Sequence, residues 1–108
     1  MASREYLGEF EQIVLLALLR LQTNAYGVPI RREIEQRTKR EVSVGALYST
    51  LDRLEAKGYV ASWFADPTAE RGGRSKRFFR IEPLGLKAVR RSQKALATML
   101  EGLDLQKV

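Results

Sequence analysis

The chain has 108 residues, with 19 Lys and Arg against 13 Asp and Glu, which gives a formal net charge of +6 and a sequence pI of about 10.0. This length suits one domain with its own core, and the basic balance favours a polyanionic partner. The sequence contains neither cysteine nor histidine, which excludes disulfides, most transition-metal sites and the commonest general base. We therefore expect no enzyme, no cofactor and no metal site.

The first predicted element is a helix from about Tyr6 to Leu21. Its apolar middle, Ile13–Leu19, falls far short of the roughly 20 residues that span a bilayer, so we expect a cytoplasmic protein without membrane contact. Apolar residues at helical spacing give the helix a core-facing stripe. The stripe consists of Leu7, Phe10, Ile13, Val14, Ala17, Leu18 and Leu21. Leu15, Leu16 and Leu19 extend the apolar surface, and either a second subunit or the rest of the same fold would cover them equally well.

A helix-turn-helix is predicted next. Pro29 is tolerated in the first turn of a helix, so the second helix should begin near residues 26–27 and run to about Arg37. The link to the following helix is short, which is typical of a motif whose first helix crosses the phosphate backbone of DNA. Lys39 and Arg40 lie in this link, and we expect them to contact that backbone.

The third predicted helix carries signals at both ends. Ser43 is a suitable N-cap, and Gly58 suits the left-handed position that ends a helix. Between them, an apolar stripe faces the core. This stripe consists of Val44, Leu47, Leu51 and Leu54. The pattern fits an ordinary amphipathic surface helix as well as a DNA-recognition helix, so its interpretation depends on its neighbours.

The opposite face of this helix is the candidate for contacts with bases. At about 100° per residue, Gly45, Ser49 and Arg53 share that face, with Tyr48 on its flank. Small residues in the first turns let the backbone approach a ligand, and hydroxyl and guanidinium groups can hydrogen-bond to base edges in a major groove. The residues expected to contact DNA from this helix are Ser43, Gly45, Tyr48, Ser49 and Arg53.

Two β-prone runs follow and predict a hairpin. The first run includes Tyr59–Phe64 and the second is Arg77–Ile81, where alternation puts Phe79 inward and Arg80 outward. The loop between them is basic and contains two glycines, which suits a narrow, electronegative minor groove. The residues expected to contact DNA here are Arg71, Gly72, Gly73, Arg74, Lys76 and Arg77. A solvated hairpin with a purely structural role is the alternative.

A long last helix is predicted from Pro83, which suits a first turn, to about Leu103. Apolar residues keep helical spacing in its far half, where the predicted domain offers nothing to pack against. They are Leu96, Met99, Leu100 and Leu103. A twofold-related copy is the simplest cover, since the helix lacks the Trp and Phe usual on a membrane-binding face. The predicted dimer interface joins these residues to Leu7, Phe10 and Leu15 of the first helix.

Together these elements predict a mainly α fold with a small β-hairpin. We interpret residues 1–82 as a winged helix-turn-helix and residues 83–108 as a dimerisation helix that packs with the first helix as a single unit. Four stretches that cover nearly the whole chain resemble the PadR family of transcriptional regulators, in its short subgroup. They are LGEFEQIVLLALLRL at 7–21, AYGVPIRREIE at 25–35, VSVGALYSTLDRLEAKGYV at 42–60 and RGGRSKRFFRIEPLGLKAV at 71–89.

The resemblance implies a dimeric bacterial repressor. It places the helix with Gly45, Tyr48 and Ser49 in the major groove and the wing on the flanking DNA, and it implies a dimer formed by the first and last helices. Members of this family often release DNA when they bind a small phenolic or multidrug-like effector, some of them between tryptophans of the terminal helices. Here the one tryptophan is Trp63 in the first wing strand, and residues 84–108 contain no aromatic residue.

Other functions are compatible with the same residues. A regulator that responds to no ligand, or one released by another protein, fits equally well. A winged helix can also bind RNA or a protein partner, because a fold alone does not fix function. An enzyme is disfavoured because nothing in the sequence supplies a nucleophile with an activating base.

Overall fold

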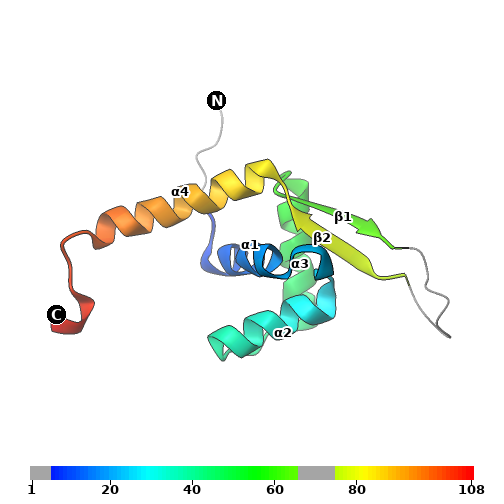
Figure 1. The fold of residues 1–108 in the computed structure, drawn as a ribbon, viewed down its shortest axis with the longest axis horizontal. Coiled ribbons are helices and arrows are strands. Elements are labelled where there is room, and N and C mark those ends of the chain that lie inside the picture. Colours follow the sequence, from blue (N-terminus) through cyan, green and yellow to red (C-terminus); the bar gives the residue numbers. More distant parts are fainter. Residues whose placement is uncertain (1–5, 66–74) are drawn as a thin grey trace.

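The computed structural model of the protein describes residues 6–65 and 75–108. It is mainly helical with one two-stranded antiparallel hairpin, which confirms the predicted winged helix-turn-helix (Figure 1). The elements in chain order are α1 (Glu9–Leu21), the 3-10 turn η1 (Gln22–Asn24), α2 (Gly27–Thr38), α3 (Val44–Ala56), β1 (Val60–Phe64), β2 (Arg77–Ile81), α4 (Pro83–Leu100) and the 3-10 turn η2 (Leu105–Lys107).

Helix ends follow the local signals of the sequence. The Ser43 hydroxyl accepts a hydrogen bond from the Ala46 N–H at 3.0 Å, which confirms it as the N-cap of α3. Gly58 has φ +79° just after α3, as expected for a residue that ends a helix. The start of α1 differs from the prediction, since Gly8 is its N-cap and donates its N–H to the Glu11 carboxylate at 3.0 Å.

The core lies where α1 meets α2, α3, β2 and the first half of α4. Its largest fully buried side chains are Phe79, Leu15, Ile30, Leu47, Leu51, Leu54 and Val14. Our prediction of Leu7 and Leu15 at a dimer interface is therefore wrong, because both are buried in the chain's own core. Helical periodicity shows which sides of a helix are apolar. It does not show whether an apolar side packs against the same chain or against a second subunit. Val44 was predicted to face the core, but it is 52% exposed.

The hairpin has two chemically different faces. Ser62 pairs with Phe79 and Trp63 pairs with Phe78 across the strands. Phe79 is buried against the helices, whereas the Phe78 ring stacks with Trp63 at 6.1 Å on the opposite face. The alternation predicted for the second strand is thus confirmed, and it directs one face of the hairpin towards α3.

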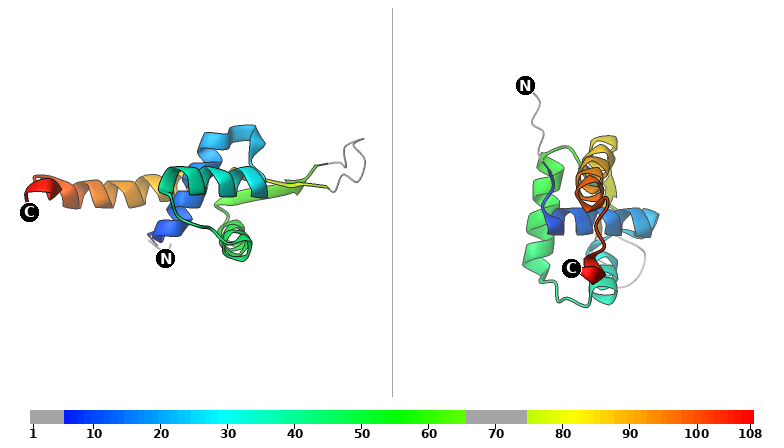
Figure 2. Two further views of the ribbon diagram at one scale, coloured as in Figure 1. Left: turned by 90° about the horizontal axis from the view of Figure 1, so that it is seen from below. Right: turned by 90° about the vertical axis from the view of Figure 1, so that its left-hand side faces the viewer.

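Helix α4 is half covered. Gly85, Ala88, Val89 and Ser92 are buried in its first half, where the Ser92 hydroxyl accepts a hydrogen bond from the Leu7 N–H at 3.0 Å. The second half extends away from the other helices, on the side of the molecule opposite the hairpin (Figures 1 and 2). None of the helices within the described parts of the chain is long and apolar enough to cross a membrane.

Candidate nucleic-acid interface

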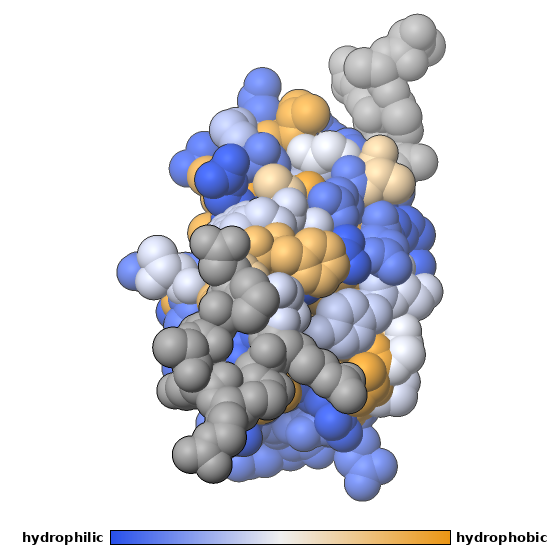
Figure 3. All heavy atoms as spheres, turned by 90° about the vertical axis from the view of Figure 1, so that its right-hand side faces the viewer, coloured by the Kyte–Doolittle hydropathy of each residue, from blue (hydrophilic) through white to orange (hydrophobic). Residues whose placement is uncertain are grey.

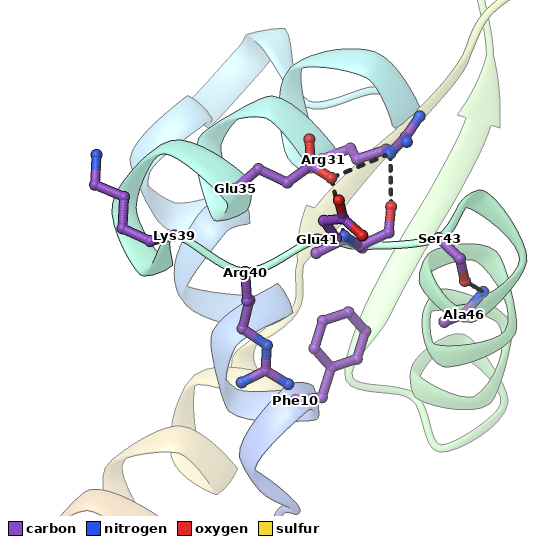
Figure 4. A pocket seen from close by; sticks show the side chains of 9 residues that line it. Phe10, Arg31, Glu35, Lys39, Arg40, Glu41, Ser43 and Ala46 are labelled. Atoms are coloured by element: carbon purple, nitrogen blue, oxygen red, sulfur yellow. Dashed lines mark hydrogen bonds and ion pairs between the residues drawn. The ribbon is translucent and has the colours of Figure 1, made fainter.

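The turn between α2 and α3 is fixed by side chains of α2. The Arg31 guanidinium donates a hydrogen bond to the Val42 carbonyl at 2.7 Å, and the Glu35 carboxylate accepts one from the Val42 N–H at 2.9 Å (Figure 4). Both backbone groups of Val42 are therefore satisfied from α2. These two bonds set the position of α3 relative to α2, and the sequence pattern gave no sign of them.

The two cations predicted in this turn behave differently. Beside the turn lies an open hollow of about 1000 Å³, which Phe10 and Arg40 help to line. Arg40 donates a hydrogen bond to the Glu9 carboxylate at 2.9 Å, and its guanidinium lies 5.6 Å from the centre of the Phe10 ring. The Lys39 side chain points away from the hollow into solvent (Figure 4). Lys39 is thus available to a phosphate, whereas Arg40 is already held against α1.

The first turns of α3 present a face of small residues. Gly45 and Ser49 are exposed, and a Cβ at Gly45 would meet no atom within 4 Å. Tyr48 is partly buried, with its ring 6.2 Å from that of Phe79. A Cβ at Gly27 would collide with the Tyr48 hydroxyl, so this glycine leaves room for the tyrosine beside the start of α2. The backbone of α3 is open to close approach there, with the hydroxyls of Ser49 and Tyr48 nearby.

Arg53 pairs with an acidic residue of α1. Its guanidinium donates a hydrogen bond to the Glu11 carboxylate of α1 at 3.1 Å and a longer one to the Thr50 hydroxyl at 3.4 Å. The Arg53 side chain is still 50% exposed, so its contact with DNA stays a prediction. Its acidic partner lies 42 positions away in the sequence.

Glu11 joins the start of α1 to the end of α3. Its side chain is 11% exposed and accepts hydrogen bonds from Gly8 N–H, Arg53 and Lys57. Burial raises the pKa of Glu11, but the Gly8 hydrogen bond and the two cations outweigh it and hold the pKa below its usual range. The folded state therefore favours the ionised carboxylate.

Glu11→Gln is expected to lower the free energy of unfolding at neutral pH by about 1–3 kcal/mol, because it weakens hydrogen bonds between charged groups. Since the folded pKa is lowered, this stabilisation is present above the carboxyl's ordinary pKa and is lost as the pH falls through the folded pKa. Urea unfolding at a series of pH values measures the difference in unfolding free energy between the unmodified protein and Glu11→Gln. Glu9→Gln is the control, since the Glu9 side chain is 77% exposed. If this difference in unfolding free energy did not decrease at acidic pH, the result would contradict this role of Glu11.

The hairpin has cations close to aromatic rings. The Lys76 ammonium lies 4.5 Å from the centre of the Tyr26 ring, and the Arg80 guanidinium lies 5.7 Å from that of Trp63. Lys76 is exposed beside the hairpin loop. The face at this end of the molecule has apolar patches within a largely hydrophilic surface (Figure 3). Of the other predicted wing contacts, Arg71, Gly72, Gly73 and Arg74 lie outside the described residues.

Arg77 is the second predicted DNA contact that is engaged within the protein. Its guanidinium hydrogen-bonds to the Asp52 and Glu55 carboxylates of α3 at 3.0 and 2.6 Å, and its side chain is only 24% exposed. The contact of Arg77 with DNA stays a prediction, and in the free chain its guanidinium is held by acids of α3. Within residues 6–65 and 75–108, no group of three or more acidic residues could hold a metal ion.

The sequence profile of the "Transcriptional regulator PadR-like family" matches residues 15–91, more than half of the chain. The chain belongs to the PadR family. PadR proteins are transcriptional regulators and not an enzyme family, so the open face of α3 and the basic hairpin belong to a DNA-binding regulator. The match spans all of α2, α3 and both strands of the hairpin.

Several solved structures share the PadR fold. A transcriptional regulator from Clostridium thermocellum is 25% identical with a TM-score of 0.70, and the match covers 84% of this chain and 85% of that one. RosR from H. salinarum is 24% identical with a TM-score of 0.70, covering 97% and 87%. A PadR family regulator from Clostridium difficile is 18% identical with a TM-score of 0.69, covering 83% and 90%. A comparison with curated proteins gave no match.

Proposed function

We propose that this chain is a cytoplasmic repressor that binds an inverted-repeat operator as a homodimer. In this proposal the first turns of α3 enter the major groove and the hairpin contacts the flanking DNA. The observation that carries it is the open face of small residues at Gly45 and Ser49, together with a hairpin that exposes Lys76 next to its loop. Such a face lets backbone and hydroxyl groups come within hydrogen-bonding distance of base edges.

The dimer is supported by apolar surface that the chain leaves open. Four side chains in and just after the second half of α4 are exposed by 45–76% of their area. They are Leu96, Met99, Leu100 and Leu103. Leu16 and Leu19 on α1 are each 38% exposed, and Phe10 is partly buried at the start of the same helix. We propose that α4 and the side of α1 that carries Leu16 and Leu19 pack against their twofold copies, with residues 1–82 forming the DNA-binding unit and 83–108 the dimerisation helix.

Footprinting on fragments selected from the source genome tests the operator. A twofold dimer with one α3 in each half-site requires protection of an inverted repeat, with half-sites about 10 base pairs or a multiple of that apart. Reporter expression with and without the protein then distinguishes repression from activation. A single unpaired site, or tighter binding to RNA than to duplex DNA, would contradict the proposal and favour a winged helix used for another partner.

Gly45→Ala separates folding from DNA binding at one position. The added methyl group has open space, and alanine is the better helix former, so the free energy of unfolding should rise by up to about 1 kcal/mol. Operator affinity should fall, because the methyl group would stand between the α3 backbone and the base edges, whereas affinity for random DNA should hardly change. Chemical unfolding and titrations on both DNAs measure the two effects. Unchanged operator affinity would mean that α3 does not approach DNA closely at Gly45.

A further inference from the structure

We propose that Arg77 is a positioning residue that joins the hairpin to α3, and thereby sets how the two DNA-contacting parts are placed relative to each other. This inference rests on the proposed function, since it concerns how that function is carried out. It departs from the expectation for a cation in the wing of a DNA-binding protein, which is direct contact with phosphate.

The contacts of Arg77 connect β2 to both β1 and α3. Its guanidinium donates to Asp52 Oδ1 at 3.0 Å, to Glu55 Oε1 at 2.6 Å and to Ser62 Oγ at 3.2 Å. The Ser62 hydroxyl in turn donates to Glu55 Oε2 at 2.8 Å. The guanidinium also lies 4.8 Å from the centre of the buried Phe79 ring. A planar guanidinium with several fixed donors is suited to hold two carboxylates at once.

The charges of Arg77, Asp52 and Glu55 affect how α3 interacts with a polyanionic ligand. Asp52 and Glu55 lie on α3, with side chains that are 60% and 35% exposed. Asp52 lies one turn after the Tyr48 and Ser49 pair, so its carboxylate is on the part of α3 next to the proposed DNA contacts. Without Arg77, two carboxylates would remain uncompensated there, and they would repel phosphates. The ion pairs therefore both hold the hairpin and neutralise α3.

Arg80 provides a matched control on the same strand. It lies on the opposite face of the hairpin, paired with Glu82 at 3.2 Å, and its side chain is 64% exposed. Arg80→Gln and Arg77→Gln remove the same charge from β2. Only Arg77→Gln removes the ion pairs to α3, so a difference between the two variants reports on those ion pairs and not on the net charge of the protein.

The first test is a double-mutant cycle for DNA affinity. Arg77→Gln should weaken operator binding by about tenfold, and Arg80→Gln by clearly less. Asp52→Asn alone should change affinity by less than about twofold, because Arg77 already compensates Asp52. Asp52→Asn in the Arg77→Gln protein should recover a large part of the lost operator affinity. A cation that contacts phosphate directly would give additive effects, and additivity would overturn the proposal.

The second test needs no DNA. Amide hydrogen exchange of residues 60–64 and 77–81 in the free protein should be faster in Arg77→Gln than in Arg80→Gln, because the hairpin is then less firmly held to α3. Arg77→Lys keeps the charge but lacks the planar fork, so it should restore little of the protection. Equal exchange in the Arg77→Gln and Arg80→Gln proteins would overturn the inference even if the unmodified protein binds its operator. Failure of the unmodified protein to discriminate between DNA sequences would instead contradict the proposed function.

Discussion

Leu100→Glu is expected to convert the protein from a dimer to a monomer at micromolar concentrations. Leu100 is 45% exposed and lies one turn after the exposed Leu96 on the same side of α4. In the proposed dimer this side is buried, so the new carboxylate would lose its hydration without gaining a partner. The dissociation constant of the dimer should rise by at least about a hundredfold, which corresponds to the several kcal/mol typical of an unpaired charge at an interface.

Light scattering and sedimentation at several protein concentrations measure this change. Thr98→Glu is the matched control, since it adds the same charge to an exposed position on the opposite side of α4. The control should remain a dimer, and both variants should keep the helical content of the unmodified protein. A Leu100→Glu protein that stays dimeric would place the interface elsewhere, and a monomeric unmodified protein would remove the dimer from the account.

The second expected result is that α3 and the hairpin contribute different kinds of binding energy. Ser49→Ala and Tyr48→Phe should each reduce operator affinity by about 1–3 kcal/mol while affinity for random DNA barely changes. Uncharged hydroxyls act at base edges and release no counterions, so the salt dependence should stay nearly constant. Phenylalanine is the suitable replacement for Tyr48 because it keeps the packing against Phe79.

The hairpin should show the reverse behaviour. Replacing Arg74 and Lys76 together by alanine should weaken operator and random DNA alike, and should reduce the slope of log affinity against log salt by up to about 2. Titrations of all variants with operator and random DNA at several salt concentrations measure the affinities and their salt dependence. Loss of specificity in the hairpin variant but not in the α3 variants would mean that the two roles are reversed.

The fold could be predicted because its signals are local. Ser43, Gly58 and Pro83 mark helix ends through their own backbone and side-chain chemistry. The alternation of Phe78 and Phe79 fixed which face of the second strand is inward. Each of these inferences needs only a few consecutive residues, and each agrees with the structure.

The cation partners in the candidate site could not be predicted in the same way. The acids that bind Arg53 and Arg77 are 42 and 22–25 positions away in the sequence, and no periodicity links them. One signal was present at Glu11, a carboxylate within the core-facing stripe of α1, where a buried charge requires a partner. Charge density in a basic hairpin therefore does not show which of its cations pair with acids of the same protein, as Arg77 does.

In the proposed function, this chain distinguishes DNA sequences through α3. Fluorescence anisotropy titration of the unmodified protein tests it most directly, with one labelled duplex carrying the footprinted repeat and a second carrying the same bases in shuffled order. At a fixed salt concentration near physiological, we expect a preference of at least about a thousandfold for the repeat. Equal affinity for the two duplexes would contradict it.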